Sequence, residues 1–187
     1  MKSKKEIREE VFAKQEELSS EYYEQATQAI HEKLLNFDLY KKAETIYIFY
    51  SMGKELDTKK IIEHAHQEGK RIGIPRTIKL GEMDFHQYEP GDTLITAKYG
   101  AEEPSPDAPT IPLDEVDLII MPCVSCNDKG ERIGYGGGFY DRILENYDGE
   151  TVLPYFSKLQ TLEIPMEEHD KKMDYVITEK SIVHILE

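Results

Sequence analysis

The chain has 187 residues, about the size of one compact domain. Its composition, with 39% hydrophobic and 32% charged residues, indicates a core beneath a heavily solvated surface. A formal net charge of −14 argues against nucleic acid as a partner. No apolar run approaches the roughly 20 residues needed to cross a bilayer, the N-terminus lacks a signal-peptide pattern, and there are only two cysteines. We therefore expect a cytoplasmic protein without a membrane partner or structural disulfides.

Residues 4–36 predict two helices, over 4–18 and 21–36. The first begins with a capping box, in which Ser3 is followed three residues later by Glu6. Both segments repeat apolar residues at helical spacing, which predicts one buried face on each helix. We expect these N-terminal helices to pack on the rest of the domain.

A buried strand is predicted next, over 45–50, where the residues are β-branched or aromatic throughout. A helix over 58–68 follows, capped by Asp57 and stopped by Gly69. A short strand over 71–75 comes after it and is expected to end at its proline.

The second half of the chain contains the strongest strand pattern, over 117–121, and two weaker ones over 151–154 and 174–178. In the proline-rich middle, a strand is plausible over 82–88, and 100–112 is predicted to be an extended surface loop.

Strands that alternate with helices, and that are apolar along their length, predict a parallel sheet covered on both faces. The expected fold is α/β: a single domain over residues 1–187, with three layers around a mostly parallel, Rossmann-like sheet. Ligands of such sheets bind beyond the carboxyl ends of the strands. The glycine-rich segment that follows the strand over 117–121 is therefore expected near that edge.

That segment, Arg132 to Asp141, has four glycines within five residues and leads into a predicted helix over 139–146. Glycines let backbone N–H groups turn toward a phosphate, and a helix N-terminus favours an anion. The spacing matches neither a Walker A loop nor a dinucleotide fingerprint. A phosphate-binding loop is the favoured interpretation, and a flexible turn is the alternative.

The loop has no lysine, so its positive charge would have to come from elsewhere. Arg132 is adjacent, and an N-terminal helix face presents Lys4 and Arg8, with Lys5 beside them. These residues form either a phosphate clamp or a solvated helix surface. Asp141 either complements the helix dipole or holds Mg²⁺ against phosphates.

Several other polar residues allow two interpretations. Glu55 follows the strand over 45–50 and is either a surface carboxylate or faces a ligand at the sheet edge. Asp170 lies in a charged segment and could be a solvated loop residue. Cys123 and Cys126 form a CxxC pair, but no matching zinc ligands accompany them, and a redox role is disfavoured.

The glycine-rich run, read with its flanks, resembles the signature of the 5-formyltetrahydrofolate cyclo-ligase (methenyltetrahydrofolate synthetase) family. The similarity extends over nearly the whole chain, through the pieces 4–8, 49–55, 70–75, 99–104, 117–122, 128–142, 164–170 and 176–178. One departure is Val124-Ser-Cys-Asn127, where the family usually has Val-Ala-Phe-Asp, so no role is carried over to those positions.

The resemblance implies an ATP-dependent conversion of 5-formyltetrahydrofolate to 5,10-methenyltetrahydrofolate, with ADP and phosphate released and Mg²⁺ as the cofactor. It implies a folate site that includes Tyr50, Glu55 and Tyr140, and a metal held by Asp141 and Asp170. The implied ATP contacts are Lys4, Lys5, Arg8, Arg132, Ile133, Gly134, Tyr135, Gly136, Gly137, Gly138, Phe139 and Tyr140. We expect a monomer or weak homodimer whose partners are these small molecules.

Three other functions stay open on the sequence. A phosphosugar-type isomerase could use the same loop for a substrate phosphate without ATP. A sensor would bind nucleotide or folate without turnover, and a thiol redox protein would depend on its cysteines.

Overall fold

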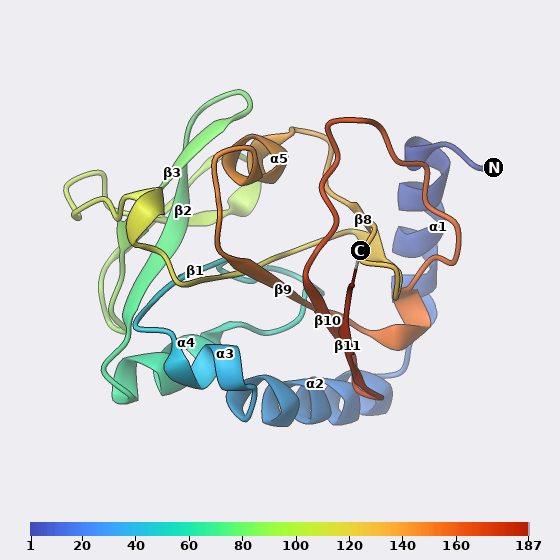
Figure 1. The fold of residues 1–187 in the computed structure, drawn as a ribbon, viewed down its shortest axis with the longest axis horizontal. Helices are drawn as coiled ribbons and strands as arrows, with labels where there is room; N and C mark the ends of the chain where they lie inside the picture. The colour runs from blue at the N-terminus through green and yellow to red at the C-terminus, as the bar shows by residue number, and fades with distance from the viewer. Residues whose placement is uncertain (187) are drawn as a thin grey trace.

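The computed structural model describes residues 1–186 as a central sheet with helices on both sides (Figure 1). The helices are α1 (Lys4–Glu17), α2 (Ser20–Leu35), α3 (Asp38–Lys42), α4 (Lys59–Gln67) and α5 (Phe139–Leu144). The strands are β1 (Thr45–Ile48), β2 (Arg71–Lys79), β3 (Glu82–Gln87), β4 (Leu94–Thr96), β5 (Glu102–Pro104), β6 (Leu118–Ile120), β7 (Ser125–Cys126), β8 (Arg132–Ile133), β9 (Glu150–Pro154), β10 (Tyr175–Ile177) and β11 (Ile182–His184).

The main sheet has seven strands in the order β11-β10-β9-β6-β1-β2-β3. The five from β10 to β2 run parallel, and β3 and β11 are added antiparallel at the edges. Counted along the chain, the parallel strands have the doubly wound order 2-1-3-4-5, which confirms the predicted α/β class. In this order the chain reverses direction across the sheet between β1 and β6, and a ligand crevice forms beyond their carboxyl ends.

The core is built from strands that are buried along their length and from the apolar faces of the helices. Every residue of β1 and β6 is buried. Helices α2, α3 and α4 cover one face of the sheet, whereas α5 lies on the other side and α1 stands at the sheet's flank (Figure 1). The capping box predicted at Ser3 is present, and Ile7 and Val11 are buried on α1.

Two predictions for the middle of the chain were wrong. Strand β2 does not end at Pro75 but continues to Lys79. Its pairing with β1 ends at Gly73, and Pro75 pairs with Phe85 of β3, an edge position at which a missing N–H is tolerated. The predicted loop over 100–112 contains strand β5, which pairs with β4 and is partly buried.

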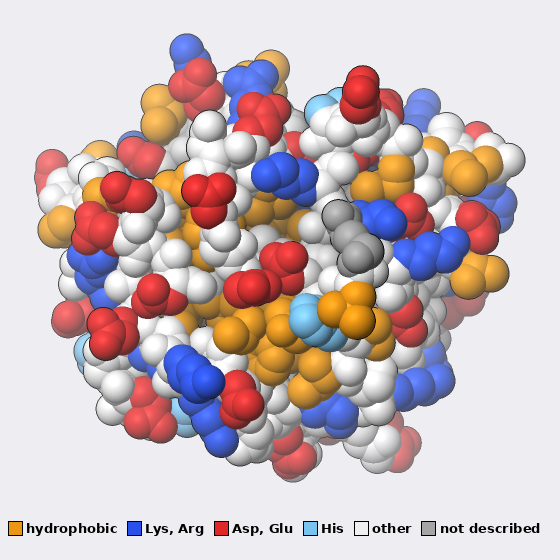
Figure 2. Space-filling model, viewed as in Figure 1, with side chains coloured by type: hydrophobic (Ala, Val, Ile, Leu, Met, Phe, Trp, Pro, Cys, Tyr) orange, Lys and Arg blue, Asp and Glu red, His pale blue; other side chains and the backbone are white. Residues whose placement is uncertain are grey.

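Acidic and basic side chains are interspersed over the face seen in Figure 2, as the high charged fraction predicts. Among residues 1–186, none of the helices is both long and apolar enough to span a membrane.

Candidate active site

A cavity of about 590 Å³ opens at the point where the sheet order predicts a ligand crevice. Phe49 and Tyr50, directly after β1, and Pro122, after β6, form part of its wall. The β2–β3 hairpin closes one side, and the glycine-rich loop closes the opposite side. The predicted residues that line the cavity are Lys4, Arg8, Tyr50, Glu55, Arg132, Gly134, Tyr135, Gly136, Gly137, Gly138, Phe139, Tyr140, Asp141 and Asp170.

The glycine-rich loop leaves the short β7–β8 hairpin and runs directly into α5. Gly136 has φ +104° and Gly138 has φ +71°, conformations that side-chain-bearing residues rarely adopt. Gly138 is the N-cap of α5 and supplies no capping side chain. The loop backbone and the first turn of α5 therefore border the cavity directly, which suits close approach of a phosphate.

Arg132 anchors the start of this loop and lines the cavity. Its Nε donates to the carbonyl oxygen of Pro122 at 2.7 Å, which ties the loop to the end of β6. Its Nη1 lies 3.7 Å from Asp141 Oδ1, and its guanidinium carbon lies 5.6 Å from the ring centroid of Tyr140. Arg132 is thus a largely buried cation between an acidic and an aromatic group.

Helix α1 reaches the same cavity through two cationic side chains. Arg8 Nε donates to the carbonyl oxygen of Gly134 at 2.8 Å across 126 residues of sequence. Lys4 Nζ donates to Asp170 Oδ2 at 2.8 Å across 166 residues. Lys4, Arg8 and Arg132 consequently gather in one cavity, where Lys4 is paired with Asp170 and Arg132 lies near Asp141. The cavity therefore offers cations for an anionic ligand together with carboxylates that could hold a cation.

The two predicted metal ligands differ in their surroundings. Burial alone would raise the pKa of Asp170, but hydrogen bonds from Lys4 and from the Glu167 N–H outweigh it and hold the pKa below its usual range. Asp170 also forms a compact cluster with Glu167 and His169. Asp141 has a longer contact, to Arg132, and lies in the first turn of α5 beside the glycines.

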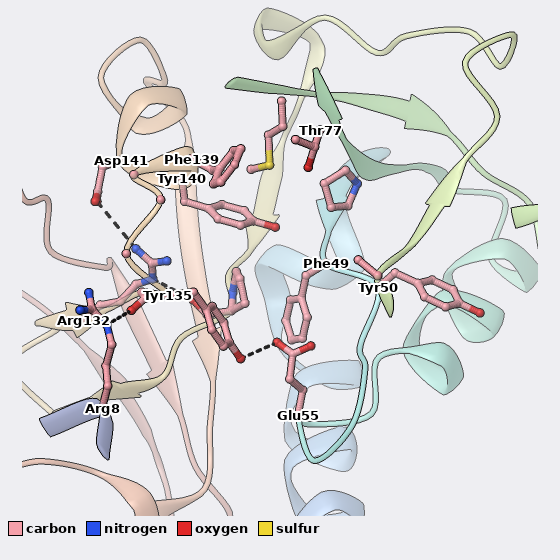
Figure 3. A pocket seen from close by; sticks show the side chains of 18 of the residues that line it. Arg8, Phe49, Tyr50, Glu55, Thr77, Arg132, Tyr135, Phe139, Tyr140 and Asp141 are labelled. Atoms are coloured by element: carbon pink, nitrogen blue, oxygen red, sulfur yellow. Dashed lines mark hydrogen bonds and ion pairs between the residues drawn. The ribbon is translucent and has the colours of Figure 1, made fainter. Parts of the chain in front are cut away.

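Tyr140 points its hydroxyl toward the β2–β3 wall of the cavity (Figure 3). The hydroxyl oxygen is buried, and within residues 1–186 it has no hydrogen-bond partner. Burial raises the pKa of this phenol well above its usual range, so Tyr140 is neutral at physiological pH. A buried, unpaired hydroxyl is uncommon and marks a position where a ligand atom could complete the bonding.

Glu55 enters the cavity from the loop after β1. Its Oε1 accepts from the Met52 N–H at 3.0 Å, and its Oε2 accepts from the Tyr135 hydroxyl at 3.0 Å (Figure 3). Burial raises the pKa of the carboxyl, and these two hydrogen bonds oppose the increase. The side of the cavity opposite the glycines therefore presents a carboxylate acceptor.

A family model described as the 5-formyltetrahydrofolate cyclo-ligase family matches residues 1–179. The chain belongs to the 5-formyltetrahydrofolate cyclo-ligase family. It is 31% identical to the Escherichia coli K12 enzyme named 5-formyltetrahydrofolate cyclo-ligase, over 88% of this chain and 94% of that one. A Schizosaccharomyces pombe protein named a probable 5-formyltetrahydrofolate cyclo-ligase is 30% identical, over 83% and 84%.

Two solved structures share the fold. The Aquifex aeolicus 5,10-methenyltetrahydrofolate synthetase superposes with a TM-score of 0.86 at 24% identity, covering 98% of this chain and 93% of that one. The Mycoplasma pneumoniae 5,10-methenyltetrahydrofolate synthetase gives 0.78 at 19% identity, covering 95% and 99%. These matches confirm the prediction that the chain is an enzyme of the cyclo-ligase family. The isomerase alternative is not favoured.

Three residues named from the cyclo-ligase resemblance contribute less to the cavity than expected. Lys5 is exposed on α1, outside the cavity wall, and the Ile133 side chain is buried in the core. The Tyr50 ring points away from Glu55 (Figure 3), toward Tyr88, with Lys59 over its face. Backbone contacts by Ile133, and ligand contacts by Lys5 and Tyr50, stay predictions.

Sequence reasoning missed the wall made by the β2–β3 hairpin, including Pro75, Thr77 and Met83. It also missed Phe49, whose ring lies beside Glu55 in Figure 3. No motif marks these residues, although the adjacent strand end was a signal for Phe49.

The segment that departs from the cyclo-ligase pattern supports the loop from the core side. Cys123 and Cys126 are buried free thiols, and Ser125 bonds to the Leu159 carbonyl oxygen and to Thr161. Asn127 Oδ1 accepts from two backbone N–H groups of the following turn. Residues 124–127 therefore lie on the core side of the site and do not line the cavity.

Proposed function

We propose that this chain converts 5-formyltetrahydrofolate and ATP to 5,10-methenyltetrahydrofolate, ADP and phosphate. The observation that carries the proposal is a single cavity with two chemically different sides. One side has a glycine-rich loop, Arg132 and Asp141, which suit a nucleoside triphosphate with a bound metal ion. The other has Glu55 and aromatic side chains, which suit a pterin. Family membership supports the same reaction.

The proposed reaction begins with activation of the formyl group. The formyl oxygen attacks the γ-phosphorus of ATP, the bond to the β-phosphate oxygen breaks, and ADP leaves. The N10 amine then attacks the activated formyl carbon and loses its proton. The N5 lone pair expels phosphate as the new ring becomes a delocalised cation. The protein supplies positioning and electrostatic stabilisation rather than a covalent intermediate.

The chain's own cations would stabilise the charge on the transferring phosphoryl group. Loop N–H groups, Arg132, Lys4 and Arg8 border the same space, and each of the three side chains is already oriented by a contact within the protein. Preorganised groups of this kind need little rearrangement as charge develops, which makes them effective in catalysis. Tyr140 lies between the two sides and would contact the formyl group or pterin through its free hydroxyl.

The site's carboxylates would hold a Mg²⁺ ion, which would supply positive charge against the phosphates. Asp141 fits this ion best, because it is next to the glycines and its protein contact is long. Asp170 is already engaged by Lys4 and by a backbone N–H, so a metal bond from it would require the Lys4 pair to open.

The reaction is tested by mixing purified protein with 5-formyltetrahydrofolate, ATP and MgCl₂ and following the near-ultraviolet absorbance of the methenyl product. We expect product only when all three are present, with one ADP per product. No product from folded protein would overturn the proposal. Product without ATP would indicate an isomerase-like use of the loop, and ligand binding without ADP release would indicate a sensor.

The metal role is tested with Asp141→Asn, which keeps the size of the side chain and removes its charge. We expect kcat to fall at least about 100-fold, because transition-state charge stabilisation of this kind contributes roughly that factor. The matched control is Asp148→Asn, an exposed aspartate just beyond α5, which should keep full activity. Equal activity in the two variants would exclude Asp141 as a ligand.

A further inference from the structure

Tyr135 and Glu55 meet across the cavity from two separate segments. Tyr135 belongs to the glycine-rich loop, and Glu55 belongs to the loop after β1, 80 residues earlier. The Tyr135 hydroxyl donates to Glu55 Oε2 at 3.0 Å, and Figure 3 shows the ring crossing the cavity toward the carboxylate. The hydroxyl is thus directed away from the glycines and toward the opposite side of the site.

The pair stands at a junction between two spaces. Both residues line the principal cavity, and both also line a neighbouring cleft of about 1040 Å³, which continues between α1 and the tip of the β2–β3 hairpin. That cleft is bordered by apolar side chains such as Phe12 and Ile78 and by Lys54 and Lys79. An elongated substrate that occupied both spaces would pass the Glu55 carboxylate.

We infer that the Tyr135 side chain positions the folate and does not contact the nucleotide, because its hydroxyl holds the Glu55 carboxylate at this junction as a hydrogen-bond acceptor. The inference rests on the proposed function. A pterin presents an amino group and a ring N–H side by side, and a carboxylate accepts both. Each oxygen of Glu55 accepts one hydrogen bond from the protein and retains capacity for another.

The same contact favours the ionised form of the carboxyl group. Burial raises the pKa of Glu55, whereas donation from the Met52 N–H and from Tyr135 lowers it. Removal of the Tyr135 hydroxyl should therefore raise the pKa of Glu55 further. The acceptor would then become protonated at a higher pH, and folate binding would fail earlier on acidification.

The other titratable groups around Glu55 do not produce that acid limb. Tyr135, Tyr140 and Cys123 face it from the glycine-rich loop, α5 and the end of β6. Burial raises the pKa of Tyr140 and Cys123, and partial burial together with the neighbouring Glu55 charge raises the pKa of the more exposed Tyr135, so all three remain neutral. Lys54, its neighbour in sequence, is ion-paired with Glu16 of α1 at 2.9 Å.

The test is Tyr135→Phe, assayed by steady-state kinetics and by equilibrium binding of 5-formyltetrahydrofolate without ATP. We expect the folate KM and Kd to rise roughly tenfold, the size of effect of losing a hydrogen bond to a charged group. The KM for ATP should change by less than about twofold, and the acid limb of kcat/KM for folate should move to higher pH. The control Tyr175→Phe makes the same chemical change on β10, distant from the site, and should behave like the wild type.

Glu55→Gln provides the second arm, as a double-mutant cycle. If Tyr135 acts through Glu55, adding Tyr135→Phe to Glu55→Gln should produce almost no further loss of folate affinity. Any of three results would overturn the inference: additive losses in the cycle, an unchanged acid limb, or a raised ATP KM with an unchanged folate KM. Turnover by the wild type is measured first. Its absence overturns the proposed function, whereas wild-type turnover with an unaffected Tyr135→Phe overturns only this inference.

Discussion

Two tyrosine hydroxyls in the site differ in whether they have a hydrogen-bond partner. Tyr135 donates to Glu55, whereas the buried hydroxyl of Tyr140 has no partner within residues 1–186. An unpaired buried hydroxyl costs free energy in the folded protein, because it has lost water without gaining another partner. A cavity that receives a ligand can retain such a cost, because the ligand removes it on binding.

Tyr140→Phe should therefore stabilise the ligand-free protein while it lowers turnover. We expect the free energy of unfolding to rise by about 1 kcal/mol, measured by urea denaturation, because a buried polar atom without a partner is removed. The matched variant is Tyr155→Phe, whose buried hydroxyl donates to the Val124 carbonyl oxygen. Tyr155→Phe should lower stability by about 1 kcal/mol or more. A similar loss in both variants would contradict a free Tyr140 hydroxyl.

At the scale of elements, one carboxylate connects segments that are remote in sequence. Glu179, just after β10, accepts from the Tyr22 hydroxyl of α2 at 2.7 Å and from the Ser157 N–H after β9 at 2.8 Å. Burial alone would raise the pKa of Glu179, but the hydrogen bonds from Ser157 and Tyr22 outweigh it and lower the pKa. This carboxylate therefore joins a helix to two strand ends.

Glu179→Gln should weaken that junction in a pH-dependent way. A carboxyl whose folded-state pKa is lowered contributes stability above its unfolded value of about 4.3 and loses it as the pH falls through the folded value. We expect a loss of about 1 kcal/mol at pH 7, where the side chain is ionised and accepts several bonds. The difference from wild type should disappear at the acid end of a urea-denaturation series. Glu63→Gln, on the exposed side of α4, is the control and should show no such trend.

At the scale of the whole molecule, the average charge opposes an anionic substrate, and the fold brings three cationic side chains to one cavity that also contains carboxylates. The net charge is −14, yet Lys4, Arg8 and Arg132 line one cavity. They come from the N-terminal helix and from the glycine-rich loop, so their convergence requires the folded chain. Binding of a nucleotide should therefore stabilise the folded state as a whole.

Differential scanning fluorimetry should reveal this linkage. With Mg²⁺–ATP at about 100 times its Kd, the free energy of unfolding should rise by about 2.7 kcal/mol. For a protein of this size that corresponds to roughly 5–10 °C in Tm. Asp141→Asn should reduce the increase, because the metal ligand is lost. An equal increase with inorganic phosphate alone would show that the cavity recognises a simple anion and not a nucleotide.

Local patterns determined much of this protein from sequence alone. The capping box at Ser3, the apolar strand of β6 and the glycine-rich loop each depend on neighbouring residues, so each was predictable. Only the tertiary structure decided the contacts of Arg8 with Gly134, Lys4 with Asp170, and Glu55 with Tyr135, which join residues 80 to 166 positions apart. The hairpin wall and the direction of the Tyr50 ring belong to the same class. No local periodicity encodes such pairings, because they follow from the order of strands in the sheet and from which loops that order brings to one edge.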